Sequence, residues 1–327
     1  MLLCKHLFRL GFGGMIRMDD LILTGPMLAS AVEAIEMKFT VHRMWQADDK
    51  SAFLAAHSKT RFMAAFGHGP IDGPLMDALP ALEMISSFGV GTDHIDLAAA
   101  KERNIRVTNT PDVLNDAVAE LAVGLMLTLC RRIVDADRHI RDGKWPDGGY
   151  PLTGELTGAK VGILGLGRIG KEVARRCQAF KMQVVYHGRT EQKFEPFPYY
   201  ANLEDMARDV DWLVAVVPGG PSTAGLVTRD VMAALGPNGA IVNVGRGNLI
   251  DEPAMLEMLK SGELGGAGLD VFLDEPAMSS EFWGLPNVVL SPHQGSATNK
   301  TRWAMGDLVV RNLAAWQNGA PLITPIV

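Results

Sequence analysis

Three residues with ionisable side chains follow apolar segments in the second half of the chain. Arg246 lies between two glycines, Glu275 precedes a proline, and His293 follows one. An arginine can hold a carboxylate through two parallel hydrogen bonds and polarise a neighbouring carbonyl. A histidine can exchange a proton with a developing alkoxide, and a nearby carboxylate orients it and favours its charged form. Together, these residue types suit proton delivery to an oxygen atom of an anionic substrate.

Each of these residues has a structural alternative when it is considered alone. An arginine between glycines can cap a strand end, a histidine after proline can bond a backbone carbonyl, and a glutamate before proline can lie on the surface. The hypothesis of a catalytic site therefore rests on the combination of Arg246, Glu275 and His293, each at the end of a predicted strand.

A glycine-rich turn is the clearest of the elements that must position a ligand. Residues 161–170 read Val-Gly-Ile-Leu-Gly-Leu-Gly-Arg-Ile-Gly, an apolar strand that leads through Gly165, Gly167 and Gly170 into a helix. In a G-x-G-x-x-G turn, the first glycine allows the tight turn, the second admits a pyrophosphate to the backbone, and the third lets helix and strand pack closely. The pattern predicts a dinucleotide with its pyrophosphate at the helix N-terminus. A purely structural glycine turn is the alternative.

The end of the next strand predicts which dinucleotide binds. NAD sites usually place an acidic residue there to hold the ribose 2′-hydroxyl. This chain has Gly188 followed by Arg189 and Thr190, and an arginine suits a 2′-phosphate. We therefore expect NADP(H) to be preferred and NAD(H) to be accepted weakly. The alternative for Arg189 is a solvated side chain.

Composition narrows the class of protein. The chain has 327 residues, a length typical of two domains, and its net charge of −6 argues against a nucleic acid partner. No run of about 18 apolar residues predicts a membrane span. Three scattered cysteines in no metal-binding spacing are typical of reduced thiols, so we expect no metal and a cytoplasmic protein.

Apolar segments alternate with helical patterns along the whole chain, which predicts parallel sheets. The fold class is therefore α/β, with two Rossmann-like, doubly wound parallel-sheet domains and an active-site cleft between them. We expect residues 110–293 to form the NADP-binding domain. Residues 1–109 and 294–327 form a discontinuous substrate-binding domain, in which 1–18 is an extension that can be disordered.

The expected elements have definite bounds. Asn115 is predicted as the N-cap of a long helix that ends near Gly143. Two further helices are expected at 168–180 and 298–316, and one at 27–37. The expected strands are 21–23, 39–43, 62–66, 83–88, 106–108, 161–164, 183–186, 212–217, 240–244, 268–272 and 288–290.

Beyond these patterns, the chain resembles the D-isomer-specific 2-hydroxyacid dehydrogenases, and within them the glyoxylate/hydroxypyruvate reductases and hydroxyphenylpyruvate reductases. The resemblance covers about 21–323. It is carried by Ser87-Phe-Gly-Val-Gly-Thr-Asp93, Thr110-Pro-Asp-Val-Leu114, Leu164-Gly-Leu-Gly-Arg-Ile-Gly170, Val244-Gly-Arg-Gly247, Gly268-Leu-Asp-Val-Phe272 with Glu275-Pro276, and Ser291-Pro-His-Gln-Gly-Ser-Ala-Thr298.

This resemblance implies a role for each matching residue. Arg246 would bind a 2-oxo acid, Glu275 would pair with His293, and His293 would be the general acid and base. The backbone N–H groups of Val90 and Gly91 would take the substrate carboxylate. The candidate cofactor-binding residues are Gly165, Gly167, Arg168, Ile169, Gly170, Gly188, Arg189, Thr190, Val217, Pro218 beside the adenine, Ser222 or Thr223 at the extra phosphate, Val244, Asp270 at the nicotinamide carboxamide, His293 and Gly295.

The activity so implied is NADPH-dependent reduction of small 2-oxo acids, glyoxylate and hydroxypyruvate first, to D-2-hydroxy acids by a homodimer. One alternative is the same chemistry on 2-ketogluconate or aryl pyruvates. Another is a dinucleotide-sensing protein, because this fold also occurs in transcriptional corepressors. The complete set of Arg246, Glu275 and His293 argues against a sensor.

Overall fold

A computed structural model describes residues 18–67 and 69–327. Apart from Met18, the predicted extension at 1–18 therefore lies outside the described residues. The contacts divide the described chain into two compact units. Unit 1 comprises the residues up to Phe88, Asp96–Thr108 and Val309–Val327, and unit 2 comprises Gly89–Ile95 and Asn109–Leu308.

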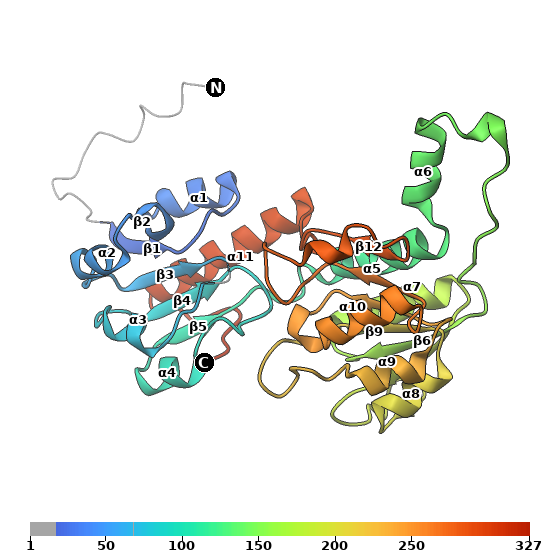
Figure 1. Ribbon diagram of the computed structural model, residues 1–327. Helices are drawn as coiled ribbons and strands as arrows, with labels where there is room; N and C mark the ends of the chain where they lie inside the picture. The colour runs from blue at the N-terminus through green and yellow to red at the C-terminus, as the bar shows by residue number, and fades with distance from the viewer. Residues whose placement is uncertain (1–17, 68) are drawn as a thin grey trace. The chain divides into compact units, whose positions relative to one another are not determined.

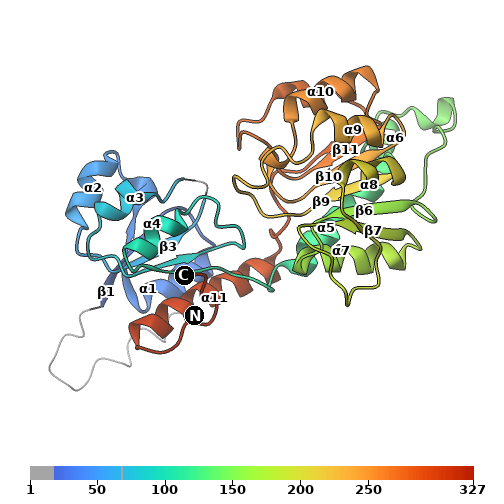
Figure 2. The same cartoon turned by 90° about the horizontal axis from the view of Figure 1, so that it is seen from below.

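Unit 1 is built on a five-stranded parallel sheet. Its strands lie in the order β2-β1-β3-β4-β5, an order typical of doubly wound folds. α1 and the end of α11 cover one face, and α2, α3 and α4 cover the other (Figure 2). The elements are β1 (Asp19–Leu23), α1 (Ala29–Glu36), β2 (Phe39–Arg43), α2 (Lys50–Ala56), β3 (Phe62–Ala65), α3 (Gly73–Asp77), β4 (Met84–Ser87), α4 (Leu97–Glu102), β5 (Arg106–Thr108) and α11 (Asn299–Gln317).

Unit 2 holds a seven-stranded parallel sheet in the order β12-β11-β10-β9-β6-β7-β8, so the chain reverses direction across the sheet between β6 and β9 (Figure 1). Ligands of such sheets bind at the carboxyl ends of the strands near this point. The strands are β6 (Lys160–Leu164), β7 (Gln183–His187), β8 (Tyr199–Tyr200), β9 (Trp212–Ala215), β10 (Ala240–Asn243), β11 (Gly266–Leu269) and β12 (Val288–Leu290).

Helices cover both faces of this second sheet, with α5 and α7 packed together on one face and α8, α9 and α10 on the other (Figure 2). The central strands β9 and β10 are consequently buried throughout, and all their residues except Asn243 are apolar. The helices are α5 (Asn115–Cys130), α6 (Ile133–Arg141), α7 (Arg168–Ala179), α8 (Leu203–Asp209), α9 (Arg229–Leu235) and α10 (Glu252–Ser261). Short 3₁₀ turns lie at Met44–Gln46, Trp145–Asp147, Gly247–Leu249 and Ser280–Phe282.

The predicted fold class of two doubly wound parallel α/β domains is confirmed by the two sheets. Short acidic or hydroxyl side chains start many of the helices. Asp96, Thr228 and Asp251 each accept a hydrogen bond from the backbone N–H three residues later, as N-caps do. No helix in the described part of the chain is both long and apolar enough to cross a bilayer.

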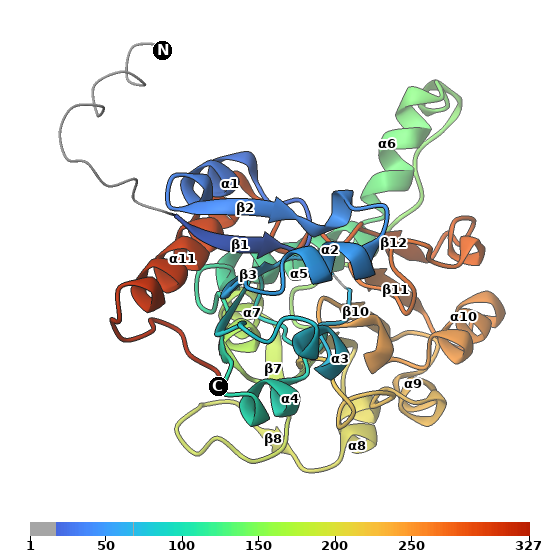
Figure 3. The same cartoon turned by 90° about the vertical axis from the view of Figure 1, so that its left-hand side faces the viewer.

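The prediction for the helix at Asn115 is wrong at both ends. Leu114 is the N-cap, and the Asn115 amide instead lies 3.4 Å from the Asp112 carboxylate. The helix stops at Cys130 because Arg132 adopts a left-handed conformation, with φ of 49°, which interrupts the helical hydrogen bonds. The Cys130 carbonyl then accepts the N–H of Gly154. α6 follows as a separate helix that projects from unit 2 (Figures 1 and 3).

One predicted strand differs from the structure by more than two residues at one end, and one observed strand was not predicted. β11 is Gly266–Leu269 rather than 268–272, because Phe272 turns away and donates its N–H to the Glu275 carboxylate. The apolar side chains of Val271 and Phe272 are nevertheless buried, which explains the mistaken strand. β8, which pairs with β7 at Tyr186 and His187, was not predicted because it is only two residues long.

Candidate functional site

His293 and Glu275 form a hydrogen-bonded pair beyond the carboxyl ends of β11 and β12. The His293 Nδ1 atom lies 2.6 Å from the Glu275 Oε2 atom, and Glu275 is the more buried of the two side chains. The other carboxylate oxygen, Oε1, accepts the N–H of Phe272 at 2.9 Å. Glu275 is therefore held in place, and its pairing with Nδ1 makes Nε2 the ring nitrogen that can serve a substrate.

The backbone at His293 is held by Asp270, at the end of β11. His293 has a φ of 48°, and its N–H donates to the Asp270 carbonyl at 2.9 Å. The Asp270 carboxylate accepts hydrogen bonds from the Ser291 hydroxyl and from the N–H groups of Gln294 and Gly295. Burial raises the pKa of the Asp270 carboxyl, and these three hydrogen bonds partly offset the effect. Asp270 thus fixes the loop that carries the histidine.

Arg246 lies in a short, tightly held loop after β10. The buried side chain of Asn243 accepts the N–H of Gly245 and donates to the Arg246 carbonyl at 2.8 Å. Gly247 follows, and a Cβ atom there would lie 1.9 Å from the Phe272 carbonyl carbon. The loops after β10 and β11 consequently touch through their backbones. This contact fixes the strand-end loops of Arg246 and Glu275 against each other.

The segment Gly89–Ile95 passes over Arg246. The Asn109 side-chain amide donates to the Val90 carbonyl at 2.9 Å, and the Thr110 N–H donates to that of Gly89. A Cβ atom on Gly91 would lie 1.7 Å from Arg246 Nη2. The structure therefore brings Arg246 against the backbone of Gly91, one of the two residues predicted to bind the substrate carboxylate.

The glycine-rich turn between β6 and α7 has the geometry that its residues require. Gly165 has a φ of +102°, and a Cβ atom there would lie 2.6 Å from the Val217 side chain. A Cβ atom on Gly170 would lie 2.1 Å from the Gly165 carbonyl oxygen. At Gly167 a Cβ atom would meet nothing within 4 Å. The turn is thus compact on its inner side and open at Gly167, where an anion could approach the backbone.

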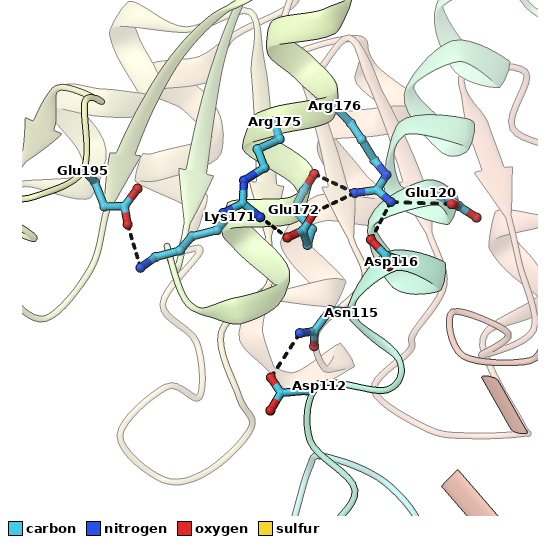
Figure 4. A network of polar contacts seen from close by, with 9 residues as sticks. All are labelled: Asp112, Asn115, Asp116, Glu120, Lys171, Glu172, Arg175, Arg176 and Glu195. Atoms are coloured by element: carbon cyan, nitrogen blue, oxygen red, sulfur yellow. Dashed lines mark hydrogen bonds and ion pairs between the residues drawn. The ribbon is translucent and has the colours of Figure 1, made fainter. Parts of the chain in front are cut away.

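Charged side chains on α7 tie this turn to its surroundings (Figure 4). Arg176 bonds Glu172 on its own helix and Asp116 on α5, and Lys171 pairs with Glu195 at 2.7 Å. Arg168, a candidate cofactor-binding residue, pairs with Asp112 at 3.0 Å. The basic residues at the start of α7 therefore have acidic partners.

The segment after β7 is open at Gly188, the position expected to select between cofactors. A Cβ atom on Gly188 would meet nothing within 4 Å, and Arg189 and Thr190 are exposed. The Tyr199 hydroxyl donates to the Gly188 carbonyl at 3.1 Å, and the Gln192 side chain donates to the Leu166 carbonyl at 2.7 Å. A cavity of about 400 Å³ adjoins this segment and is lined by Lys171 and residues 191–195.

Two candidates for contact with an extra phosphate differ in their surroundings. The Thr223 hydroxyl donates to the Pro218 carbonyl at 2.8 Å, which engages its proton within a turn. Ser222 is exposed beside it. Ser222 is therefore the better placed of the two to donate to a phosphate. Val244 is buried, and its N–H donates a hydrogen bond to the carbonyl of Ala215, the last residue of β9.

The sequence did not predict that Asp93 contacts Arg246, although Asp93 ends one of the motifs quoted above. Arg246 Nε lies 3.1 Å from Asp93 Oδ1 and 3.2 Å from Oδ2. An acidic residue two positions after a glycine gives no sign, by itself, of a partner more than 150 residues later in the chain. Only the fold reveals the pair.

Comparison with known proteins places these features in a family. The model of the NAD binding domain of the D-isomer specific 2-hydroxyacid dehydrogenases matches residues 123–295. The chain is 44% identical over 303 residues to a hydroxyphenylpyruvate reductase of Plectranthus scutellarioides. It is 45% identical, also over 303 residues, to the glyoxylate/hydroxypyruvate reductase A HPR2 of Arabidopsis thaliana. Each match covers 92% of this chain and 97% of the relative.

Solved structures give a concordant result. The NADPH-dependent glyoxylate/hydroxypyruvate reductase of Sinorhizobium meliloti, in complex with NADP and malonate, superimposes with a TM-score of 0.89 at 42% identity. The match covers 94% of this chain and 97% of that protein.

Proposed function

Because the chain belongs to the D-isomer-specific 2-hydroxyacid dehydrogenase family, we propose that it reduces small 2-oxo acids to D-2-hydroxy acids with NADPH. Glyoxylate and hydroxypyruvate are the leading substrates. The observation that carries the proposal is the hydrogen bond between His293 Nδ1 and Glu275 Oε2, beyond the strand ends. A histidine oriented in this way by a carboxylate is suited to general acid and base catalysis.

The chain's own residues divide the work of the reaction. A bound nicotinamide cofactor would supply the hydride for the reduction. Arg246 and the backbone N–H groups of Val90 and Gly91 bind the 2-oxo acid, and the guanidinium polarises its carbonyl group. His293 donates a proton from Nε2 to the substrate oxygen as negative charge develops there. Glu275 stabilises the imidazolium and keeps Nδ1 protonated, so that Nε2 is the site of proton exchange.

Preference for NADPH is a separate part of the proposal. Gly167 and Gly188 have open space where a side chain would point, so the backbone can approach a bound phosphate at both positions. Arg189, Thr190 and Ser222 are exposed and can pair with a 2′-phosphate. An acidic side chain at position 188 would repel that phosphate.

The first experiment is to follow oxidation of NADPH and NADH with glyoxylate, hydroxypyruvate, an aryl pyruvate and 2-ketogluconate. We expect fast NADPH turnover with the two small acids and slow turnover with NADH. Equal rates with the two cofactors would refute the cofactor preference while keeping the reductase. Bound cofactor without turnover of any of the four acids would overturn the proposed activity.

The variant Gly188→Asp tests the basis of the cofactor preference. The new carboxylate can accept a hydrogen bond from the ribose 2′-hydroxyl and repels a 2′-phosphate. The ratio of kcat/KM for NADPH to that for NADH should fall about 100-fold, equivalent to two interactions of 1.4 kcal/mol each. Gly148→Asp, at an exposed glycine in another loop, is the matched control. An unchanged ratio would remove Gly188 from cofactor selection.

An aryl pyruvate is the second candidate substrate, because the relative from Plectranthus scutellarioides bears the name of such a reductase. 2-Ketogluconate stays an alternative for the same chemistry. The comparison of four acids separates these possibilities, since each would show the highest kcat/KM with its own acid.

A homodimer is the expected assembly, and α6 and the loop after it support this proposal. Ile140, Trp145 and Leu152 are large apolar side chains with 56%, 63% and 101% exposure. Such residues on a projecting element are typical of a surface that another chain covers. Light scattering at several concentrations should give twice the chain mass, and Ile140→Lys should lower it. A monomeric parent protein would contradict the proposal.

We propose that residues 110–293 bind the cofactor and that residues 1–109 together with 294–327 bind the substrate. We also propose a cytoplasmic location. Fractionation of cells expressing the native gene tests the location. Cofactor binding by an isolated fragment of 110–293 would support the division.

A further inference from the structure

Arg246 is held by a carboxylate on a distant part of the chain. Both oxygens of Asp93 lie within 3.2 Å of Arg246 Nε, and the two side chains are 26% and 29% exposed. The pair joins the loop after β10 to the segment Gly89–Ile95, and both belong to unit 2. Asp93 is therefore placed to determine how the guanidinium is oriented.

Glycines on two sides leave the guanidinium little room to move. A Cβ atom on Gly91 would lie 1.7 Å from Arg246 Nη2, and one on Gly219 would lie 2.7 Å from Arg246 Cγ. The same atom on Gly219 would lie 3.3 Å from Asp93 Cγ. The arginine and the aspartate thus fill a slot between two stretches of backbone, and a side chain at either glycine would displace them.

The hydrogen bonds of Arg246 divide its donors into two groups. Nε–H donates to Asp93, and Nη1 donates to the Gly245 carbonyl at 2.8 Å. Nη2 lies against Gly91, on the side where the backbone of Val90 and Gly91 is proposed to bind the substrate carboxylate. With Nε occupied, a substrate must bind through the Nη edge of the guanidinium.

We propose that Asp93 is a positioning residue for the reaction, which turns the Nη2 side of Arg246 toward Gly91 and the substrate. This inference rests on the proposed function, because it concerns the same substrate. Asp93 acts through Arg246 and does not itself transfer a proton. The orientation matters most in the transition state, when the guanidinium must meet the charge that develops on the carbonyl oxygen.

The two effects of Asp93 on the substrate have opposite signs. Its negative charge opposes binding of an anionic acid, whereas its hold on Nε aligns the guanidinium. Asp93→Asn removes the charge and weakens the hold. We therefore expect kcat to fall about 30-fold, as a small misplacement of a positioning group can do. KM for the 2-oxo acid should change less than about threefold.

A double-mutant cycle tests whether Asp93 acts through Arg246. Lysine has no Nε–H donor of this geometry, so in an Arg246→Lys background the change Asp93→Asn should cost about twofold or less. NADPH affinity, measured by fluorescence, should be unchanged in every variant. Asp77→Asn is the matched control, because Asp77 holds Arg103 through Nε and Nη2 at 2.8 and 3.0 Å in unit 1. Its kcat and KM should equal those of the parent protein.

The outcomes separate this inference from the function on which it rests. A parent protein that reduces none of the acids overturns both. An active parent with unchanged kcat in Asp93→Asn overturns the positioning role alone. Equal losses from Asp93→Asn in the parent and in Arg246→Lys would mean that Asp93 acts independently of Arg246, which also overturns it. A fall in kcat that Asp93→Asn causes in the parent protein, which has Arg246, but not in the Arg246→Lys variant supports the positioning role.

Discussion

Each of the two units contains a histidine paired with a carboxylate, but the pairs differ in position and in the nitrogen they use. In unit 1, His42 Nε2 lies 2.8 Å from Asp20 Oδ1, and both residues belong to adjacent strands, β2 and β1. The His42 ring also contacts the His57 ring in a tilted arrangement, with ring centroids 3.9 Å apart. In unit 2, His293 pairs through Nδ1 and lies in a loop beyond β12. The two pairs have similar residue types, so the proposed catalytic role of His293 and Glu275 depends on their position beyond the strand ends.

Arginine–aspartate pairs show the same contrast. Arg103 and Asp77 join α4 to α3 on the outside of unit 1. Arg246 and Asp93 form an equivalent pair beside Gly91, at the carboxyl end of a parallel sheet, where ligands bind. Two parallel sheets thus carry similar ion pairs, and it is the position at the strand-end loops that supports the proposed role of the Arg246 pair in substrate binding.

The largest effect is expected from replacing the histidine of the unit 2 pair. His293→Ala removes the proton donor, so kcat should fall about 10³-fold while NADPH still binds. Steady-state kinetics and cofactor fluorescence measure the two quantities. His42→Ala is the control in unit 1 and should leave kcat within about twofold. Activity of His293→Ala within a few-fold of the parent would refute the acid and base role.

A smaller effect is expected at the arginine of the second pair. Arg246→Ala removes the anchor for the carboxylate, so KM for the 2-oxo acid should rise and kcat/KM should fall about 100-fold. Arg103→Ala, at the corresponding pair of unit 1, should leave both constants unchanged. An unaltered KM in Arg246→Ala would exclude its role as anchor.

The smallest effect, on stability alone, is expected at the amino ends of the unit 1 strands. Glu83 bonds Arg61 through both oxygens and also Trp316, and the hydrogen bond from Arg61 holds the pKa of Glu83 below its ordinary value. Glu83→Gln should therefore lower the free energy of unfolding by about 1 kcal/mol or less, since the pair is partly solvated. Kinetic constants should not change.

The pH dependence of this effect follows from the direction of the shift. A carboxyl whose pKa is lowered by folding adds stability above its unfolded pKa and loses it as the pH falls. The difference between parent and Glu83→Gln should therefore be full at pH 7 and shrink below the ordinary pKa of 4.5. Urea unfolding at pH 7 and pH 4 measures it. A difference that grows in acid would contradict the assignment.

Local patterns predicted much of this fold because segments rich in apolar and β-branched residues alternate with helical patterns along the chain. The expected bounds of β2, β5 and β12 equal those observed. The predicted C-terminal end of the helix at Asn115 was wrong because Arg132 adopts a left-handed backbone conformation. Arginine is not a residue type that indicates such a conformation in advance. A pattern of apolar positions does not reveal such a backbone break, after which the Cys130 carbonyl accepts the N–H of the distant Gly154.

Some contacts of the candidate site were likewise predicted from the sequence, and others were not. The pairing of Glu275 with His293 was predicted from the residue types together with a family resemblance, and the two side chains do meet. The contact of Asp93 with Arg246 was not predicted, because the two residues are distant in sequence. Nothing in the sequence around Asp93 distinguishes it from a neighbouring acidic residue such as Asp96. Similarly, the hydrogen bond from the Thr223 hydroxyl to the Pro218 carbonyl depends on a turn whose conformation was not predicted from the sequence.

The backbone contact at Gly247 has a consequence for how this chain can diversify. Because Gly247 has no room for a Cβ atom against the Phe272 backbone, the loops that carry Arg246 and Glu275 are in direct backbone contact. A substitution at this position would displace both loops at once. We therefore expect tolerated substitutions to occur at positions that leave this backbone contact unchanged. In a saturation library, position 247 should accept glycine alone, whereas exposed positions such as Trp283 tolerate exchange.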